Sequence, residues 1–377
     1  MKPFDVLIVG AGVVGCAVAR ECALSGYRVG VIEGATIGNG ATAAGMGHVV
    51  VMDDSPAQLA LTAFSRSLWR RDSAKMPKSI EYETCGTIWV AADDEEMAEV
   101  HARRKTYNEA GIEAQALTPA ELAREEPNLR AGLTGGLLVP GDGVVYPPAA
   151  AAFYLAEARR LGAELFLARA LSAANGQVLL SDGVTLTSDR IVLAAGTQCD
   201  LLPSLPIQKR KGHLVITDRY PGFVRHQLVE LGYLKSAHKV IEDSVAFNVQ
   251  PRQTGQLLLG SSRQYGNEQS EVEPEILIRM LDRAAAYMPG IRSLSVLRMW
   301  TGFRAATQDK LPLIGPASGL SDDRTLWLAA GFEGLGITNA PGAAQLLVDR
   351  MLGRTSAIDP TPYLPARMAQ PAGLAHV

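Results

Sequence analysis

The first 33 residues contain the feature that most restricts how this chain can fold. An apolar run, FDVLIVG at residues 4–10, leads into the glycine-rich turn AGVVG, and a second apolar run, YRVGVIE, ends at residue 33. The stretch between them has one apolar face and stops at Ser25-Gly26, as a helix would. Strand, glycine turn, helix and strand within about thirty residues make one βαβ unit, which predicts a parallel sheet covered by helices.

The glycines of this turn are spaced as Gly10-x-Gly12-x-x-Gly15. Such glycines permit a tight turn, expose backbone amides to a pyrophosphate at the helix start, and let the helix pack closely on the strand. Glu33 ends the second strand, where a carboxylate can accept hydrogen bonds from the ribose hydroxyls of an adenosine. We therefore expect a Rossmann-like site for NAD or FAD, because an acid here disfavours a 2'-phosphate. A glycine turn without a ligand is the alternative.

Two later segments also favour close contact between backbone and ligand. GNGATAAGMGH, residues 38–48, has few side chains to pack, so it suits a backbone that lies flat against a ligand; an ordinary flexible loop is the alternative. His48 ends this segment and is a candidate for lining the same cavity. GFEGLGITN, residues 331–339, leads into the last helix, whose first amides attract negative charge. A helix start capped by Thr338 or Asn339 fits that pattern equally well.

Composition excludes several classes of partner. The chain has 377 residues, enough for two domains, and its 36 basic and 39 acidic residues leave a net charge of -3. This balance gives no reason to expect nucleic acid or an anionic lipid surface as a partner. The four cysteines form no CxxC pair, so we expect no metal site and a reducing compartment. No apolar run reaches the roughly 18 residues of a transmembrane helix.

The N-terminus imitates a secretion signal. Lys2, the apolar run from Val6 and the sequence before Cys16 resemble a signal peptide with a lipoprotein cleavage site. However, Asp5 lies where such a signal is positive, and cleavage before Cys16 would remove all three glycines of the turn. We therefore expect a cytoplasmic protein whose first residues fold as the βαβ unit.

The domain organisation follows from where the α/β pattern recurs along the chain. We expect an α/β protein, α+β mixed, in which a Rossmann-like cofactor-binding domain is interleaved with an antiparallel-sheet substrate domain. The first domain is assigned to residues 1–77, 142–206 and 323–357, and the second to 78–141 and 207–322. Residues 358–377, which are rich in proline, are predicted to form a mobile tail.

Two groups of basic residues raise the question of what neutralises them. WTGFRAATQDKLPLIGP, residues 300–316, places Arg304 after an aromatic and apolar run. A buried unpaired charge costs several kcal/mol, so the partner of Arg304 is either a fixed acid such as Asp309 or the carboxylate of a ligand. The run Lys209-Arg210-Lys211 favours a solvated strand edge that discourages sheet pairing. Contact with an anionic cofactor or a partner subunit is the alternative for that run.

With IVLAAGT at residues 191–197, these motifs occur in an order that resembles FAD-dependent amine and D-amino-acid oxidoreductases, the family of glycine oxidase and sarcosine oxidase. The resemblance covers nearly the whole chain and implies a Rossmann-like FAD-binding domain. It implies non-covalent FAD, because sarcosine oxidases often attach flavin to a late cysteine and no cysteine follows Cys199. The implied FAD contacts are Gly10, Gly12, Val13, Val14, Gly15, Glu33, Gly34, Ala41, Thr42, Gly45, Met46, Gly47, Leu171, Ala195, Gly196, Gly331, Glu333, Gly334, Leu335, Gly336, Ile337 and Thr338.

The same resemblance implies the substrate site. Arg304 would bind a substrate carboxylate, His48 would assist catalysis and contact substrate, and Asn248 with Phe247 would lie near the other end of the substrate. Glycine-oxidase-like members have a histidine and an arginine where this chain has Phe332 and Gly334, which argues against glycine as the substrate. The reaction implied is hydride transfer from the carbon next to the substrate nitrogen to N5 of FAD.

The GFEGLGIT form is similar to flavin subunits of D-hydroxyproline dehydrogenase, hydrogen cyanide synthase and opine oxidases. It therefore favours an amino-acid dehydrogenase subunit acting on a D-configured or cyclic amino acid, with D-hydroxyproline first. It also implies partner subunits with an iron-sulfur cluster or a second flavin, FMN at a subunit interface, and association with the inner face of a membrane through those partners. The alternatives are a glycine or sarcosine-type oxidase, an opine oxidase or hydrogen cyanide synthase subunit, a NAD-dependent Rossmann dehydrogenase, and a non-catalytic FAD-binding subunit.

Overall fold

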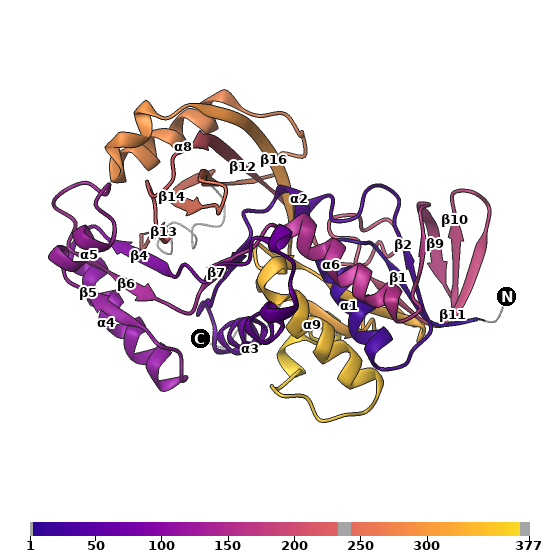
Figure 1. Ribbon diagram of the computed structural model, residues 1–377. Coiled ribbons are helices and arrows are strands. Elements are labelled where there is room, and N and C mark those ends of the chain that lie inside the picture. Colours follow the sequence, from indigo (N-terminus) through magenta and orange to yellow (C-terminus); the bar gives the residue numbers. More distant parts are fainter. Residues whose placement is uncertain (1–2, 233–242, 370–377) are drawn as a thin grey trace.

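The computed structural model describes residues 3–232 and 243–369, and its strands form two large sheets and one short ribbon. In Figure 1 the two sheets lie side by side, and the short ribbon runs between them. Strands from distant parts of the chain meet in each sheet, so the polypeptide passes from one sheet to the other several times.

The first sheet has the order β17-β18-β11-β1-β2-β8. The five strands from β18 to β8 are parallel, and β17 joins the edge in the antiparallel direction. A hairpin, β9 and β10, extends from β11. The bounds in sheet order are β17 (Leu313–Pro316), β18 (Leu326–Ala330), β11 (Thr185–Leu193), β1 (Phe4–Val9), β2 (Val29–Ile32) and β8 (Glu164–Phe166), followed by β9 (Ala170–Ala174) and β10 (Gln177–Leu180).

Helices cover one face of this sheet because their apolar stripes need a surface to bury. Figure 1 shows α1, α6 and α9 gathered beside β1, and α3 packs against α9. The residues of this interface form the largest apolar cluster of the structure, from Val6 to Tyr363. The helices concerned are α1 (Val13–Leu24), α3 (Pro56–Asp72), α6 (Pro147–Arg160) and α9 (Gly336–Met351).

The second sheet has nine strands in the order β19-β16-β12-β15-β14-β13-β4-β6-β5. Neighbouring strands are antiparallel except β13 and β4, which are parallel. The bounds in sheet order are β19 (Phe332–Glu333), β16 (Val296–Ala306), β12 (Gln208–Arg219), β15 (Gln256–Tyr265), β14 (Ser244–Pro251), β13 (Gln227–Glu230), β4 (Thr87–Ala91), β6 (Gly135–Val139) and β5 (Gln115–Leu117).

Helix α8 (Pro274–Tyr287) covers the outer face of this sheet over β14 and β15, and the opposite face is left toward the first sheet (Figure 1). Helices α4 (Asp94–Glu109) and α5 (Pro119–Glu125) lie at the far end, against β4, β5 and β6. The remaining elements are the ribbon β3 (His48–Val49) with β7 (Gly143–Val144), the short helix α2 (Ala41–Ala44), and the 3-10 helices η1 (Ser73–Lys75), η2 (Lys78–Ile80), η3 (Pro289–Ser293), η4 (Thr361–Tyr363) and η5 (Pro365–Ala369).

The expected fold class is confirmed, since a parallel, helix-covered sheet is interleaved with a mainly antiparallel one. The division into domains stays a proposal and needs two corrections. Strand β17 belongs to the first sheet although residues 207–322 were assigned to the second domain, and β19 belongs to the second sheet although 323–357 were assigned to the first. Both strands are too short for a sequence pattern to show which sheet they complete.

The prediction of a mobile tail at residues 358–377 is wrong for its first part. Tyr363 is only 1% exposed, and its hydroxyl donates a hydrogen bond to the carbonyl of Ala57 at 2.6 Å. Arg367 forms an ion pair with Asp309, with Nε and Oδ2 2.7 Å apart. Proline content suggested mobility here, but one buried aromatic side chain and one ion pair attach the segment. Residues 370–377 of the expected tail lie outside the described residues.

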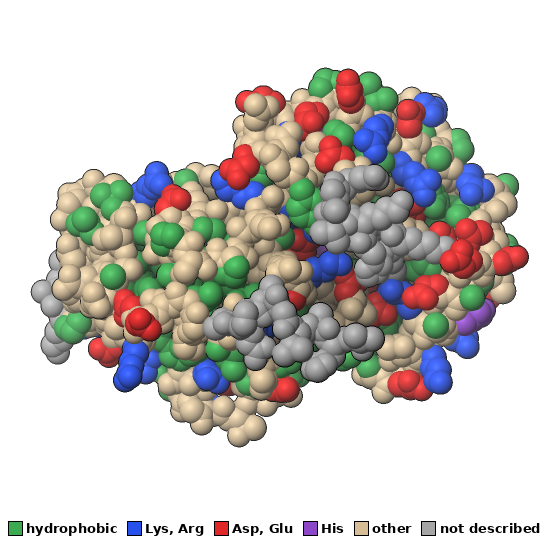
Figure 2. Space-filling model, turned by 180° about the vertical axis from the view of Figure 1, so that it is seen from behind, with side chains coloured by type: hydrophobic (Ala, Val, Ile, Leu, Met, Phe, Trp, Pro, Cys, Tyr) green, Lys and Arg blue, Asp and Glu red, His purple; other side chains and the backbone are tan. Residues whose placement is uncertain are grey.

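The surface fits the nearly balanced charge of the chain. Figure 2 shows acidic and basic side chains interspersed over the face it presents. Of the helices that the structure describes, none is long and apolar enough to cross a membrane. Residues 3–232 and 243–369 also contain no group of three or more His, Cys, Asp or Glu side chains that could hold a metal ion.

Candidate active site

A cavity of about 650 Å³ lies between the two sheets. On the first sheet it is lined by residues at the ends of the parallel strands, including Val9, Ile32 and Ala330, and by Ala194 directly after β11. On the second sheet it is lined by side chains of the face opposite α8. Ligands of open parallel sheets bind outside the carboxyl ends of the strands, so the cavity has the position expected of a cofactor site.

The glycine turn between β1 and α1 opens onto this cavity. Gly10 has a φ of +108°, which favours glycine, and a Cβ atom there would lie 2.6 Å from the carbonyl oxygen of Ala194. Helix α1 has Gly12 as its N-cap and no side-chain cap, although the amide of Val13 donates to Oγ1 of Thr42 at 3.0 Å. Gly12, Val13 and Val14 all line the cavity, so the positive end of the helix dipole faces it.

Glu33 lies at the same end of the cavity. Its carboxylate accepts hydrogen bonds from the amides of Ala11 and Ala35, at 2.7 and 2.8 Å. These contacts hold the acid beside the glycine turn, at the end of β2 where the sequence places the ribose contact.

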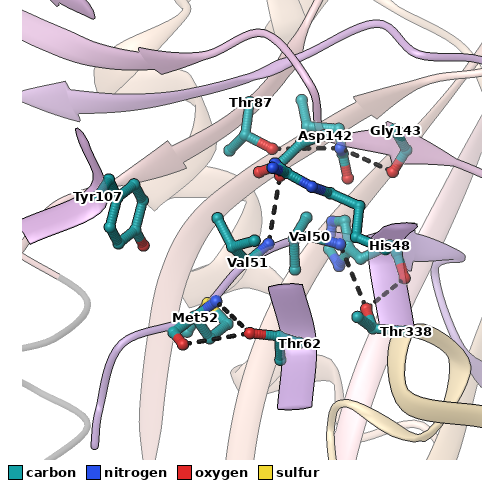
Figure 3. Close-up of polar contacts among 12 residues, drawn as sticks. His48, Val50, Val51, Met52, Thr62, Thr87, Tyr107, Asp142, Gly143 and Thr338 are labelled. Carbon is teal, nitrogen blue, oxygen red and sulfur yellow. Dashed lines mark hydrogen bonds and ion pairs between the residues drawn. The ribbon is translucent and has the colours of Figure 1, made fainter. Parts of the chain in front are cut away.

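The start of α9 presents a second helix N-terminus to the cavity. Leu335 is its N-cap, no side chain caps it, and the residues from Gly334 to Ile337 line the cavity. The alternative of a cap by Thr338 is wrong, because Thr338 Oγ1 donates to the carbonyl of His48 at 2.9 Å and accepts from the amide of Val50 at 3.3 Å (Figure 3). Two helix starts, neither capped by the side chain of its own N-cap residue, therefore direct their positive dipole ends at one cavity.

These features fit an elongated anionic cofactor. A Cβ atom on Gly40 or Gly196 would meet no atom within 4 Å, so the backbone is open at both positions. Helix α1 offers its first amides to a pyrophosphate and α9 offers its own to a ring system that carries negative charge. Glu33 completes the set with a hydrogen-bond acceptor for a ribose. FAD combines these three chemical groups in one molecule.

The second sheet contributes side chains with a period of two, as expected of one face of a sheet. Thr87 and Trp89 come from β4, and Gln227 and Val229 from β13. The same alternation continues with Asn248 from β14, Ser261 and Arg263 from β15, and Arg210, Gly212 and Leu214 from β12, whereas all four residues from Gly302 to Ala305 of β16 line the cavity.

Arg304 lies on β16 directly opposite Arg210 of β12. Its Nη1 donates to the carbonyl oxygen of Ser262 at 3.1 Å, and no carboxylate among the described residues forms an ion pair with it. The alternative of a fixed pair with Asp309 is wrong, because Asp309 binds Arg367. Burial and the nearby Arg210 cation lower the pKa of Arg304 to about 10, so it remains charged at neutral pH.

His48 and Asn248 lie beside each other in the cavity. Burial, with a smaller contribution from Arg304, lowers the pKa of His48 to about 4, and the neighbouring Asn248 side chain acts in the opposite sense. His48 is therefore a neutral imidazole at physiological pH. Apart from this contact with each other, His48 Nε2 and Asn248 Oδ1 are buried without a hydrogen-bond partner among the described residues. A buried polar atom without a partner costs free energy, so both atoms are suited to binding a ligand.

The basic run at residues 209–211 does not form the solvated edge that its charges suggested. Strand β12 lies inside the second sheet, paired with β15 and β16. Arg210 is 3% exposed and forms an ion pair with Glu333, and Lys211 is 0% exposed and binds Glu273 at 2.7 Å. Sequence reasoning missed this because the partner acids lie 123 and 62 residues away along the chain.

Sequence reasoning also missed Arg263 and Asp54, which line the cavity. The signal for Arg263 is its place at the end of QLLLGSSRQY, where alternate residues share a face. Asp54 lies in a loop, and we see no pattern in the sequence that could have indicated it.

Three of the predicted site residues do not line the cavity. Phe247 is 0% exposed and stacks on Tyr287 with ring centroids 4.6 Å apart, because successive residues of a strand point to opposite faces. Gly15 lies behind the turn, where a Cβ atom would be 1.9 Å from the carbonyl oxygen of Gly10. Thr338 supports the backbone of His48 from outside.

The other predicted residues all line the cavity, and their roles stay proposals. They are His48, Arg304, Asn248, Gly10, Gly12, Val13, Val14, Glu33, Gly34, Ala41, Thr42, Gly45, Met46, Gly47, Leu171, Ala195, Gly196, Gly331, Glu333, Gly334, Leu335, Gly336 and Ile337.

Comparison with known proteins agrees with this geometry. A family described as DAO, FAD dependent oxidoreductase, matches residues 5–350. A glycine oxidase of Geobacillus kaustophilus is 28% identical over 96% of this chain and 96% of its own length. Hydrogen cyanide synthase subunit HcnC of Pseudomonas aeruginosa is 24% identical over 99% of both chains. A crystal structure of glycine oxidase from Geobacillus kaustophilus superimposes with a TM-score of 0.86 at 26% identity, covering 97% of this chain and 99% of the other.

Proposed function

Because this chain belongs to the DAO family of FAD-dependent oxidoreductases, we propose that it oxidises the C–N bond of an amino acid whose carboxylate is bound by Arg304. The choice between NAD and FAD, which the glycine motif left open, is thereby decided in favour of FAD. The observation that carries the proposal is the partly buried Arg304 guanidinium in the cavity, whose hydrogen-bond partner among the described residues is the Ser262 carbonyl. A carboxylate is the ligand that this fork of N–H donors matches best.

When bound, FAD supplies the acceptor for the hydride that leaves the carbon next to the substrate nitrogen. We infer that the protein contributes position rather than strong acid or base chemistry. Arg304 fixes the carboxylate, and Asn248 Oδ1 is suited to accept a hydrogen bond from the substrate nitrogen. His48 Nε2 is a second acceptor or donor according to its tautomer, and its low pKa keeps it uncharged. Loss of the hydride and of one nitrogen proton leaves an imine, which water hydrolyses.

The cofactor contacts are likewise proposals. Helix α1 would bind the pyrophosphate, Glu33 the adenosine ribose, and the start of α9 the polar edge of the flavin ring. We expect this binding to be non-covalent, because none of the cavity-lining residues that the structure describes is a cysteine. Denaturation with acid should then release all the yellow colour into solution, whereas colour retained on the protein would contradict it.

The finer substrate assignment rests on the sequence alone. A D-configured or cyclic amino acid, with D-hydroxyproline as the specific hypothesis, is compatible with a cavity in which Asn248 could also bind a ring hydroxyl. The substrate assignment is tested by adding one compound at a time, anaerobically, to the FAD-bound protein and measuring the bleaching of the flavin absorbance. The compounds are glycine, sarcosine, D- and L-proline, the D-hydroxyproline isomers and opines. Bleaching by any amino acid eliminates a non-catalytic FAD-binding role. If none of them reduces the flavin, the proposed function is wrong.

We also propose, from the resemblance to subunits such as HcnC, that the chain works with partner subunits that accept its electrons. This proposal includes an iron-sulfur cluster or an FMN at the interface with those partners. It also includes a location at the inner face of a membrane, reached through the same partners. Oxygen consumption by the purified chain separates the two cases. Rapid uptake would identify a self-sufficient oxidase, whereas reduced flavin that persists in air would favour a dehydrogenase subunit.

A further inference from the structure

Two oppositely charged side chains, Lys310 and Asp54, approach each other at the edge of the cavity. Both line it, and Nζ of Lys310 lies 3.8 Å from Oδ2 of Asp54. Lys310 follows β16, the strand that carries Arg304, and Asp54 lies between β3 and α3. The side chains of Lys310 and Asp54 are 28 and 20% exposed, whereas those of Arg210 and Glu333, which line the same cavity, are 4 and 9% exposed. Lys310 and Asp54 therefore stand where the cavity near Arg304 meets solvent.

The loop that carries Asp54 is held by contacts on both sides. The preceding residue, Asp53, forms an ion pair with Arg103 of α4. The amide of Asp54 donates to Oε1 of Gln58 at 3.2 Å. The Asp54 carboxylate lies close enough to Arg210 to oppose the lowering of the pKa of that arginine. The loop is thus fixed, and the carboxylate of Asp54 stays beside the basic residues of the cavity.

The loop that carries Lys310 is held just as firmly. Lys310 has a φ of +61°, a conformation that residues with a side chain rarely adopt and that is often found at functional sites. Its amide donates to the carbonyl of Thr307 at 3.3 Å, and Thr307 Oγ1 donates to the carbonyl of Leu311 at 2.8 Å. The neighbouring Asp309 is fixed by its ion pair with Arg367. These contacts keep the unusual backbone in place and set the Lys310 ammonium at the edge of the cavity.

The ion pair itself is weak. A separation of 3.8 Å is too long for a hydrogen bond, and ion pairs that are partly exposed contribute little to stability. Its two charges match those of an α-amino acid, which at neutral pH carries a carboxylate and an ammonium group. A small zwitterion that enters between Lys310 and Asp54 replaces one loose ion pair with two charge-assisted contacts.

We propose that Lys310 and Asp54 form an entrance site, which receives the amino acid as a zwitterion before its carboxylate reaches Arg304. This inference rests on the proposed function and adds a binding site to it. Lys310 holds the carboxylate, and its flexible four-carbon stem can follow the ligand inward, while Asp54 holds the ammonium group. A carboxylate that lacks the ammonium group is attracted by Lys310 and repelled by Asp54, so the site favours amino acids over simple acids.

The association rates of two ligands that cannot be oxidised test the entrance site. 2-Aminoisobutyrate is a zwitterion without a hydrogen on its α-carbon, and pivalate has the same shape with a methyl group in place of the ammonium group. Each ligand is mixed with the FAD-bound protein in a stopped-flow instrument at low ionic strength, where screening is weak. Binding is followed by flavin absorbance and tryptophan fluorescence. The measured quantity is the ratio of the association rate constant of 2-aminoisobutyrate to that of pivalate.

The variants should change this ratio in a defined way. Asp54→Asn should slow the association of 2-aminoisobutyrate and speed that of pivalate, so the ratio should fall by about fivefold or more. Lys310→Met should slow both ligands, because each brings a carboxylate. Lys209 and Glu268 form an exposed ion pair outside the cavity, so Lys209→Met and Glu268→Gln make the same changes of charge and should keep the wild-type ratio.

The outcomes separate this inference from the proposed function. An unchanged ratio in Asp54→Asn overturns the inference, and so does faster association of both ligands, because the ion pair would then be only a barrier. Failure of 2-aminoisobutyrate to bind the wild type overturns it too, since this ligand carries both charges that the site requires. If amino acids bleach the flavin of the wild type and the ratio does not respond to Asp54→Asn, the proposed function stands and only the entrance site is wrong. If no amino acid bleaches the flavin, the proposed function itself fails.

Discussion

A Cβ atom added to Gly212 would lie 2.5 Å from Nη1 of Arg304, so the guanidinium occupies the space that this glycine leaves empty. The two residues are diagonal neighbours on β12 and β16, where Gly212 pairs with Gly302 and Arg304 with Arg210. The sheet thus makes room for one arginine side chain to lie along its surface in the cavity.

Gly212→Ala should displace that guanidinium without removing its charge. We expect the KM for the amino acid to rise about tenfold or more, because the paired hydrogen bonds to a carboxylate need a fixed orientation. Gly334→Ala is the matched control, since its Cβ would lie 3.6 Å from Nε of the same arginine, an ordinary contact distance. Steady-state kinetics with both variants, together with their FAD content, provide the measurement. An equal KM in the two variants would contradict the steric argument.

Arg304→Lys should keep the positive charge and lose the fork of donors. We expect substrate affinity to fall by about 10- to 100-fold while FAD stays bound. Rapid-reaction measurement of flavin reduction against substrate concentration gives the affinity separately from the rate. Arg298→Lys on the exposed part of the same strand is the control and should behave as the wild type. Unchanged affinity in Arg304→Lys would mean that this arginine has a structural role only.

His48 should make the fold less stable in mild acid. Its pKa of about 4 lies below the usual 6.5, so the unfolded chain binds more protons between these values, and stability is lost as the pH falls through that range. Through His48, the free energy of unfolding changes by at most about 1.4 kcal/mol per pH unit. His48→Gln should remove this contribution, so the two unfolding free energies should differ in a pH-dependent way when measured in urea at pH 7, 6 and 5. Asp142, whose raised pKa of about 6 acts in the opposite sense, is present in both proteins and cancels in the difference. Parallel curves for the two proteins would contradict the assignment.

Thr338→Val should loosen the connection between α9 and the strand that carries His48. The change removes the hydrogen bonds to the His48 carbonyl and from the Val50 amide and leaves both groups buried without their partner (Figure 3). We expect the free energy of unfolding to fall by about 1–2 kcal/mol. Thr338→Ser retains the hydroxyl and should recover most of that loss. Equal stability of the Val and Ser variants in urea unfolding would show that the hydroxyl is dispensable.

Tyr363→Ala should destabilise the protein by about 3 kcal/mol, because it empties a buried site beneath the segment once expected to be mobile. Tyr363→Phe keeps the ring and loses only the hydrogen bond to Ala57, so it should cost about 1 kcal/mol. Thermal unfolding of the three proteins makes the comparison. The same cost for both variants would mean that the ring contributes little.

The sequence predicted best what depends on neighbouring residues. The βαβ unit, its glycines and Glu33 follow from spacing within about thirty residues, and the turn and acid lie together in the structure. The sequence could not show which acids neutralise Arg210 and Lys211, because those pairs form only when distant strands meet. Phe247 and Asn248 were proposed together, although a period of two allows only one of two adjacent strand residues to face a ligand. Choosing between them requires the register of β14, which the pairing with β13 and β15 sets.

The exchange of strands between the two sheets also governs how the molecule can be made. The first sheet closes with β18 and the second with β19, and both come from residues after 325. A ribosome must therefore synthesise almost the entire polypeptide before either sheet is complete, and contacts of such long sequence separation form slowly. Cutting the gene anywhere between the codons of β4 and β18 gives two fragments, neither of which contains every strand of either sheet. Expression hosts with ample chaperones, rather than separately cloned halves, suit a chain of this topology.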